Sequence, residues 1–299
     1  MAGAPTARSA DAATTVLTSR NRGAPLASLL SLVLALAAPA WTPAWTPAWA
    51  GAPEFSGAFV QGGLVQGRAE PGSKIALDGR PVRVSPEGVF LLGFSRDAAR
   101  ATLEVTGPTG LLETRVLAIK KRKFDIQKID GLPEAFVTPP PELEARIKEE
   151  GELVDRARRR DDARTDFLIG FDWPVQGRVS GVYGSQRILN GKPRAPHYGV
   201  DIAGPVGTPV LAPAAGVVTL AADLYFTGWT VILDHGHGLS SVFMHMAGAT
   251  AKAGQRLAKG EEVGRLGATG RATGPHLHWG MNLFDVRLDP QLLVPPMPQ

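Results

Sequence analysis

The sequence of 299 residues contains no cysteine. Disulfide bonds, thiolate nucleophiles and cysteine-ligated zinc sites are therefore excluded, and any metal site has to be built from histidine and carboxylate side chains. Glycine and proline are abundant, with 35 and 25 residues. This composition favours turns and short strands over long helices.

Histidine is absent from the first 196 residues. A random scatter would not leave so much of the chain without histidine, so a functional cluster in the C-terminal part is the simpler explanation. The six histidines of the sequence are His197, His235, His237, His245, His276 and His278.

Long hydrophobic runs are also lacking, apart from the one between Leu26 and Ala38. Arginines precede this run and small-residue cleavage signatures follow it, as in an export signal. We interpret residues 1–50 as a cleaved signal peptide with a Trp/Pro/Ala spacer, and expect an exported protein of the periplasm or cell envelope. An uncleaved membrane anchor and a disordered tail are the alternatives.

The basic clusters Lys120–Lys123 and Arg156–Arg160 lack interleaved aromatic residues that could stack on bases. Although the net charge is +4, a strand end and a solvated helix face explain these clusters better than a nucleic-acid patch. We expect no nucleic-acid partner.

The remaining sequence predicts a mostly β protein with three further parts. Closely spaced turn signals, among them Asp78-Gly79, predict a small immunoglobulin-like β-sandwich over 51–125. Charged helix-forming residues predict a helical connector over 126–168. Gly-punctuated strands predict a second β domain over 169–299, which holds every histidine.

Two patterns in the second β domain suggest a metal site. His276 and His278 would lie on the same face of a strand, with Leu277 on the opposite face toward a core. His197 and Asp201 could reach one metal if the chain turns between them. These four groups exceed the three protein ligands usual for catalytic zinc, so one of them should act beside the metal instead.

The other histidines are ambiguous. His245 lies in the alternating stretch Ser241–Met246, where a lone histidine is commonly a hydrogen-bonded strand residue. His235 and His237 lie in a Gly-rich turn without a nearby third ligand. A second metal site there is the less favoured interpretation.

Taken together, His197-x-x-x-Asp201, Met244–Met246 and Gly274–His278 resemble, in order and spacing, the lysostaphin-type (LytM-like) family of zinc metallopeptidases, which cut peptidoglycan peptides. The resemblance covers residues 171–290.

The resemblance implies that His197, Asp201 and His278 bind one Zn²⁺ per chain and that His245 and His276 are catalytic. It further implies an endopeptidase that hydrolyses the peptide crosslinks of peptidoglycan through a metal-activated water. The resemblance does not extend to the N-terminal β domain, which we interpret as a spacer or as a docking module for cell-wall or divisome proteins.

Two alternatives compete with this prediction. A LytM-like regulator could bind murein, or activate an amidase, without hydrolysing anything itself, but all five expected residues are present. A biotinyl or lipoyl carrier domain has a similar β pattern. The candidate lysines for a carrier, Lys252 and Lys259, lack the flanking methionine.

Overall fold

The computed structural model describes residues 52–131 and 139–298. The predicted export signal and spacer lie outside the described residues, so that prediction stays untested. None of the helices in these two ranges has the length and hydrophobicity that crossing a membrane requires.

The N-terminal β module consists of a three-stranded sheet in the order β1-β2-β5 and a four-stranded sheet in the order β4-β3-β6-β7. Buried side chains of both sheets, including Val65, Phe90, Ile75 and Leu103, form one core, which agrees with the expected β-sandwich. The strands are β1 (Glu54–Gly57), β2 (Leu64–Arg68), β3 (Lys74–Leu77), β4 (Arg80–Val82), β5 (Val89–Gly93), β6 (Arg100–Thr106) and β7 (Leu112–Ala118).

The hairpin between β3 and β4 follows directly from its two turn residues. Asp78 has a φ of 50° and Gly79 a φ of 74°. Positive φ at both positions is the signature of a type I′ turn, whose twist matches that of the flanking strands. The Asp78 carboxylate also accepts a hydrogen bond from the backbone N–H of Thr102, which ties the turn to β6.

The connector is only partly helical. Its first residues form β8 (Ile126–Ile129), which pairs in parallel with β10 (Gln186–Leu189). The partner strand lies far along the chain, so local sequence could not reveal this pairing. The α-helix is confined to α2 (Glu144–Arg158), with 3₁₀ turns before and after it, η1 (Pro141–Leu143) and η2 (Asp166–Ile169).

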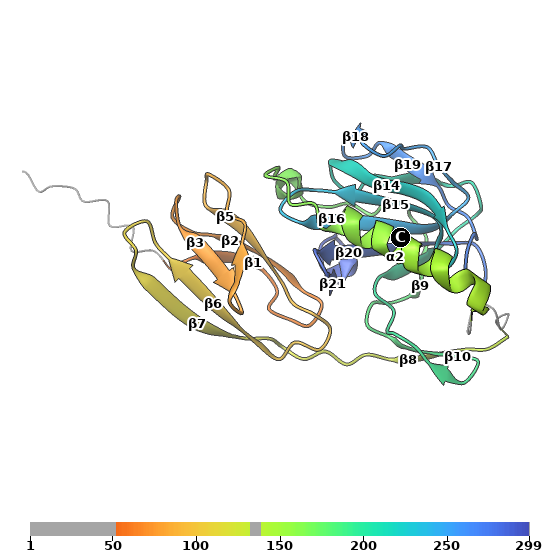
Figure 1. The fold of residues 1–299 in the computed structure, drawn as a ribbon, viewed down its shortest axis with the longest axis horizontal. Helices are drawn as coiled ribbons and strands as arrows, with labels where there is room; N and C mark the ends of the chain where they lie inside the picture. The colour runs from red at the N-terminus through yellow and green to blue at the C-terminus, as the bar shows by residue number, and fades with distance from the viewer. Residues whose placement is uncertain (1–51, 132–138, 299) are drawn as a thin grey trace, which may run out of the picture. The chain divides into compact units, whose positions relative to one another are not determined.

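Helix α2 lies on one face of the large C-terminal sheet (Figure 1). Val154 and Ala157 pack against Leu220, Ile232 and Val242, while most of the other helix residues are charged. This narrow apolar stripe is what the sparse hydrophobic pattern of the connector predicts.

The C-terminal domain is built on an eight-stranded sheet in the order β18-β14-β15-β16-β20-β12-β9, with β21 paired to β20. A small sheet, β13-β19-β17, accompanies it. The strands and the last 3₁₀ turn are β9 (Arg178–Gly181), β11 (Lys192–Pro193), β12 (Val200–Ala203), β13 (Pro209–Leu211), β14 (Gly216–Leu224), β15 (Gly228–Asp234), β16 (Leu239–Met246), β17 (Gly248–Ala249), β18 (Arg256–Leu257), β19 (Glu262–Arg265), β20 (His276–Leu283), β21 (Val286–Leu288) and η3 (Pro290–Leu292).

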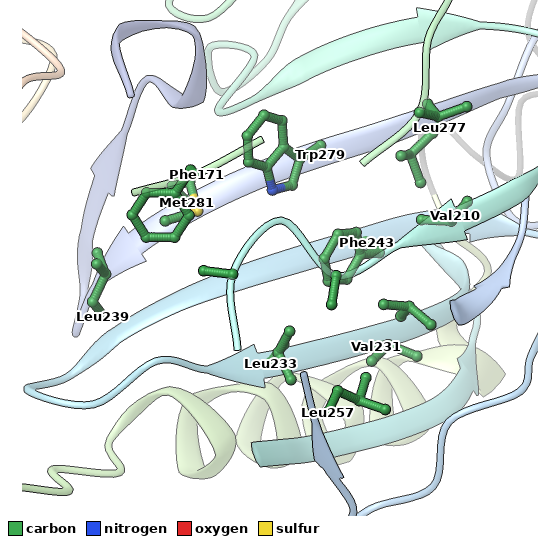
Figure 2. Close-up of a cluster of buried hydrophobic side chains, with 14 of the residues drawn as sticks. Phe171, Val210, Val231, Leu233, Leu239, Phe243, Leu257, Leu277, Trp279 and Met281 are labelled. Carbon is green, nitrogen blue, oxygen red and sulfur yellow. The ribbon is translucent and has the colours of Figure 1, made fainter. Parts of the chain in front are cut away.

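The two faces of β20 carry different residues. Leu277, Trp279 and Met281 point into the hydrophobic core together with Phe243 of β16 (Figure 2). His276 and His278 alternate with them and therefore lie on the opposite face. The expectation that Leu277 would enter a core is confirmed, because its side chain is fully buried. The core thus fixes the plane from which the histidines project.

We predict that Leu277→Ala lowers the free energy of unfolding by about 2–5 kcal/mol, because the truncation leaves a cavity in a close-packed core. Urea denaturation should show the loss as a lower midpoint. The control, Leu211→Ala, removes a side chain that is 38% exposed and should change stability by less than about 0.5 kcal/mol. Equal midpoints for the two variants would contradict this account of the core.

Candidate metal centre and active site

Three side chains from β12, β20 and the loop before β12 meet at one point. His197 Nε2 lies 2.8 Å from Asp201 Oδ1 and 2.8 Å from His278 Nδ1. His278 Nδ1 lies 2.9 Å from the same carboxylate oxygen. The antiparallel register pairs Asp201 directly with His278, which places both side chains on the same face. The structure therefore brings all three predicted ligands together.

The protonation of this group favours a cation at its centre. His197 Nδ1 lies 3.1 Å from the Val182 carbonyl oxygen, and because a carbonyl can only accept, Nδ1 carries the proton. This leaves Nε2 as the nitrogen that faces Asp201 and His278. Burial lowers the pKa of His278 to about 4, so the His278 ring is neutral at pH 7. Imidazole nitrogens and a carboxylate oxygen in mutual contact are a donor set that fits a divalent metal ion.

The carboxylate of Asp201 is held ionised and oriented. Burial alone would raise its pKa, but the contacts with His197 and His278 hold it well below the usual range. The second oxygen, Oδ2, accepts a hydrogen bond from Arg187 Nη2 at 3.0 Å. Arg187 thus fixes which oxygen faces the two imidazoles, a supporting role typical of groups behind metal ligands.

Two glycines leave the space that these side chains occupy. A Cβ at Gly199 would stand 2.6 Å from the His278 ring and 2.7 Å from the Trp279 carbonyl oxygen. A Cβ at Gly181 would stand 2.5 Å from Asp201 Oδ2. Contacts this short do not occur in folded proteins, so neither position tolerates a side chain unless the ligands move.

His245 reaches the same site through a β-bulge. Between β15 and β16 the register shifts, and His245 adopts a φ of 62°. Phe243 and Met246 both pack in the core, three positions apart, so the extra residue breaks the alternation. Regular alternation would turn His245 toward the core. Bulges commonly redirect a side chain in this way.

His245 and His276 flank the predicted metal ligands. Their Nδ1 atoms lie 2.9 Å and 2.8 Å from the carbonyl oxygens of Thr269 and Gly274, so Nδ1 donates on each ring and Nε2 is the nitrogen left to face other groups. The two ring centroids are 4.9 Å apart, and His276 Nε2 stands 3.8 Å from Asp201 Oδ1. Burial and the neighbouring imidazoles lower the pKa of His245 to about 3.

A cavity of about 140 Å³ opens over these groups. Most of its wall could not be predicted from the sequence, because the side chains come from separate segments that carry no motif. The lining residues are Gln127, Ile129, Ser180, Arg187, Leu189, Asp201, His245, Arg271, Thr273 and His276.

The remaining histidines lie elsewhere. His235 is fully buried, with Nδ1 2.7 Å from the Ala215 carbonyl oxygen and Nε2 2.8 Å from Ser241 Oγ. His237 packs its ring against Phe167. Neither joins a group of three possible ligands. Within the described residues, His197, Asp201 and His278 are the group that could hold a metal ion.

Comparison with known proteins decides the family. The model of peptidase family M23 matches residues 195–290. A crystal structure of a putative peptidase M23 from Pseudomonas aeruginosa is 33% identical, with a TM-score of 0.61 over 78% of this chain and 93% of that chain. The chain belongs to peptidase family M23. This membership confirms the predicted LytM-like family and the mostly β fold.

Curated relatives match over shorter segments. Peptidoglycan DD-endopeptidase ShyA of Vibrio cholerae is 33% identical over 141 residues, 46% of this chain and 32% of that protein. An uncharacterized metalloprotease of Haemophilus influenzae is 40% identical over 118 residues, 38% of this chain and 25% of that protein. The M23 chain therefore spans about a third or less of the length of these curated relatives.

We predict that Gly199→Ala weakens metal binding at least about tenfold, because its Cβ displaces the His278 ring, and misplaced ligands commonly cost 10–100-fold in affinity. Competition with a chromophoric chelator measures the change. Gly248→Ala is the matched control, since no atom lies within 4 Å of the Cβ it would add. Unchanged affinity in Gly199→Ala would contradict the described packing around His278.

Proposed function

We propose that this M23 chain is a zinc-dependent endopeptidase that hydrolyses peptide crosslinks of bacterial peptidoglycan. The observation that carries the proposal is the convergence of His197 Nε2, Asp201 Oδ1 and His278 Nδ1 beside two further imidazoles. Two imidazoles and one carboxylate within mutual reach form the donor set that catalytic zinc takes in proteins.

His197, Asp201 and His278 would hold the zinc ion, which leaves a position for water or substrate in a tetrahedral site. When bound, zinc supplies Lewis acidity, which polarises a carbonyl oxygen and acidifies water to near neutral pH. The hydrogen bond from His197 Nδ1–H to the Val182 carbonyl keeps its ring in the ligating tautomer. Arg187 keeps Asp201 Oδ1 turned toward the metal position.

His245 and His276 have the catalytic roles in this proposal. On each ring Nδ1 is taken by a carbonyl, which leaves Nε2 as the nitrogen that can exchange a proton with water or with a leaving amine. After accepting a proton, either ring can stabilise negative charge that develops on the carbonyl oxygen. Fixing both rings through carbonyls at Nδ1 limits their motion and favours a defined reacting geometry.

Peptidoglycan as the substrate is proposed from the relatives, whose names include peptidoglycan DD-endopeptidase in Vibrio cholerae. A small cavity with polar and apolar walls suits a peptide with short side chains. Such a substrate places the protein in the periplasm or cell envelope, with docking of cell-wall or divisome proteins through the N-terminal β module. A regulator that binds murein without cleaving it remains the competing function.

We predict that His278→Ala abolishes both zinc binding and murein hydrolysis, because it removes a ligand. His276→Ala should keep about one zinc per chain and still lose hydrolysis at least about a hundredfold, since positioned acid–base groups contribute 10²–10⁴-fold. Elemental analysis and mass spectrometry of released fragments measure the two quantities. If His276→Ala cleaves murein at the wild-type rate, that residue has no part in the reaction; if the zinc-loaded wild type releases no fragments, the regulator is favoured.

Arg187→Gln should weaken zinc affinity about tenfold, because Asp201 loses the contact that orients it. Hydrolysis at saturating zinc should recover most of the wild-type rate, which separates a positioning role from a catalytic one. Arg178→Gln serves as the control, because this arginine of β9 is exposed and pairs with Ala203 rather than with Asp201. Wild-type zinc affinity in Arg187→Gln would show that Asp201 needs no such support.

A further inference from the structure

Strand β8 of the connector lies beside the active site, although it precedes the segment that matches the M23 family by more than sixty residues. It pairs in parallel with β10, with Gln127 opposite Arg187 and Ile129 opposite Leu189. Side chains of paired residues share a face of the sheet. All four of these side chains line the catalytic cavity.

The opposite face of β8 points away from the cavity. Ile126 is 66% exposed, and Lys128 is exposed as well. Neither lines the cavity. Each face of β8 thus carries one isoleucine: Ile129 faces the catalytic cavity and Ile126 faces solvent. Burial alternates along the strand in the same sense, with Gln127 and Ile129 half-buried.

The β8 residues add both polar and apolar groups to the cavity. The side-chain oxygen of Gln127 accepts a long hydrogen bond of 3.4 Å from Arg187 Nε. Its amide N–H₂ group donates to no acceptor among the described residues, so it is available to a ligand in the cavity. Ile129 and Leu189 place an apolar patch beside it. This combination suits a peptide carbonyl next to a small apolar side chain, such as the methyl group of alanine.

We propose that β8 is a wall of the substrate groove, where the Gln127 amide donates to a substrate carbonyl and Ile129 contacts the adjoining small side chain. The inference rests on the proposed peptidase function. In such a peptidase the connector belongs to the substrate-binding unit. Part of the substrate specificity then lies outside residues 195–290, which match the M23 family model. Gln127 and Ile129 bind substrate, whereas Arg187 acts through Asp201.

The test uses the full-length zinc-loaded chain and compares Ile129→Trp with Ile126→Trp. An indole at position 129 fills much of a cavity of about 140 Å³, so hydrolysis of purified murein should fall at least about tenfold. The same substitution at position 126 points into solvent and should leave hydrolysis within about twofold. Zinc content and thermal unfolding midpoints verify that both variants are folded and loaded.

Gln127→Ala gives a second measurement in the same assay. Losing one neutral hydrogen bond should raise KM for soluble crosslinked muropeptides about three- to tenfold. kcat should change less than about twofold, and Lys128→Ala should resemble the wild type. A wild-type KM in Gln127→Ala, or full hydrolysis by zinc-loaded Ile129→Trp, would overturn the proposed wall.

Binding measured without turnover separates this inference from the proposed function. Calorimetric titration of the same muropeptides into chains carrying His276→Ala should show weaker binding with Ile129→Trp than with Ile126→Trp. If this difference in affinity is found and the chain without substitutions never hydrolyses murein, the result supports the wall and contradicts the peptidase. Equal affinities in an enzyme that does hydrolyse murein would contradict the wall alone. No affinity in the parent chain would contradict both.

Discussion

The site depends on the convergence of two imidazole nitrogens and one carboxylate oxygen, from His197, His278 and Asp201, at one buried point. The hydrogen bond of His197 Nδ1 to the Val182 carbonyl leaves Nε2 facing Asp201 Oδ1 and His278 Nδ1 at 2.8 Å each. Two imidazoles and a carboxylate in mutual contact are a donor set that fits a divalent metal ion. A cation held there would offset the cost of burying the Asp201 charge.

The rest of the domain holds these atoms in place. The antiparallel register of β12 and β20 sets Asp201 opposite His278, and the core residues on the other face of β20 fix its plane. Gly199 leaves room for the His278 ring, while Arg187 orients the carboxylate. The geometry therefore depends on several separate local contacts rather than on one element.

Sequence periodicity predicted what lies along a single strand. The period of two placed His276 and His278 on one face and Leu277 in the core, as observed. It could not predict the bulge that turns His245 toward the site, because the extra residue is defined only by the register with β15. Nor could it place β8 in the cavity wall, since parallel pairing with β10 joins segments some sixty residues apart. The roles assigned to His197, Asp201 and His245 came from the family resemblance.

Anomalous diffraction from crystals of the zinc-loaded chain, recorded on both sides of the zinc absorption edge, tests the central claim most directly. The account predicts one strong peak per chain, about 2.0–2.2 Å from His197 Nε2, Asp201 Oδ1 and His278 Nδ1. A peak at His235 or His237, or none between the three named atoms in a chain that retains zinc, would contradict it.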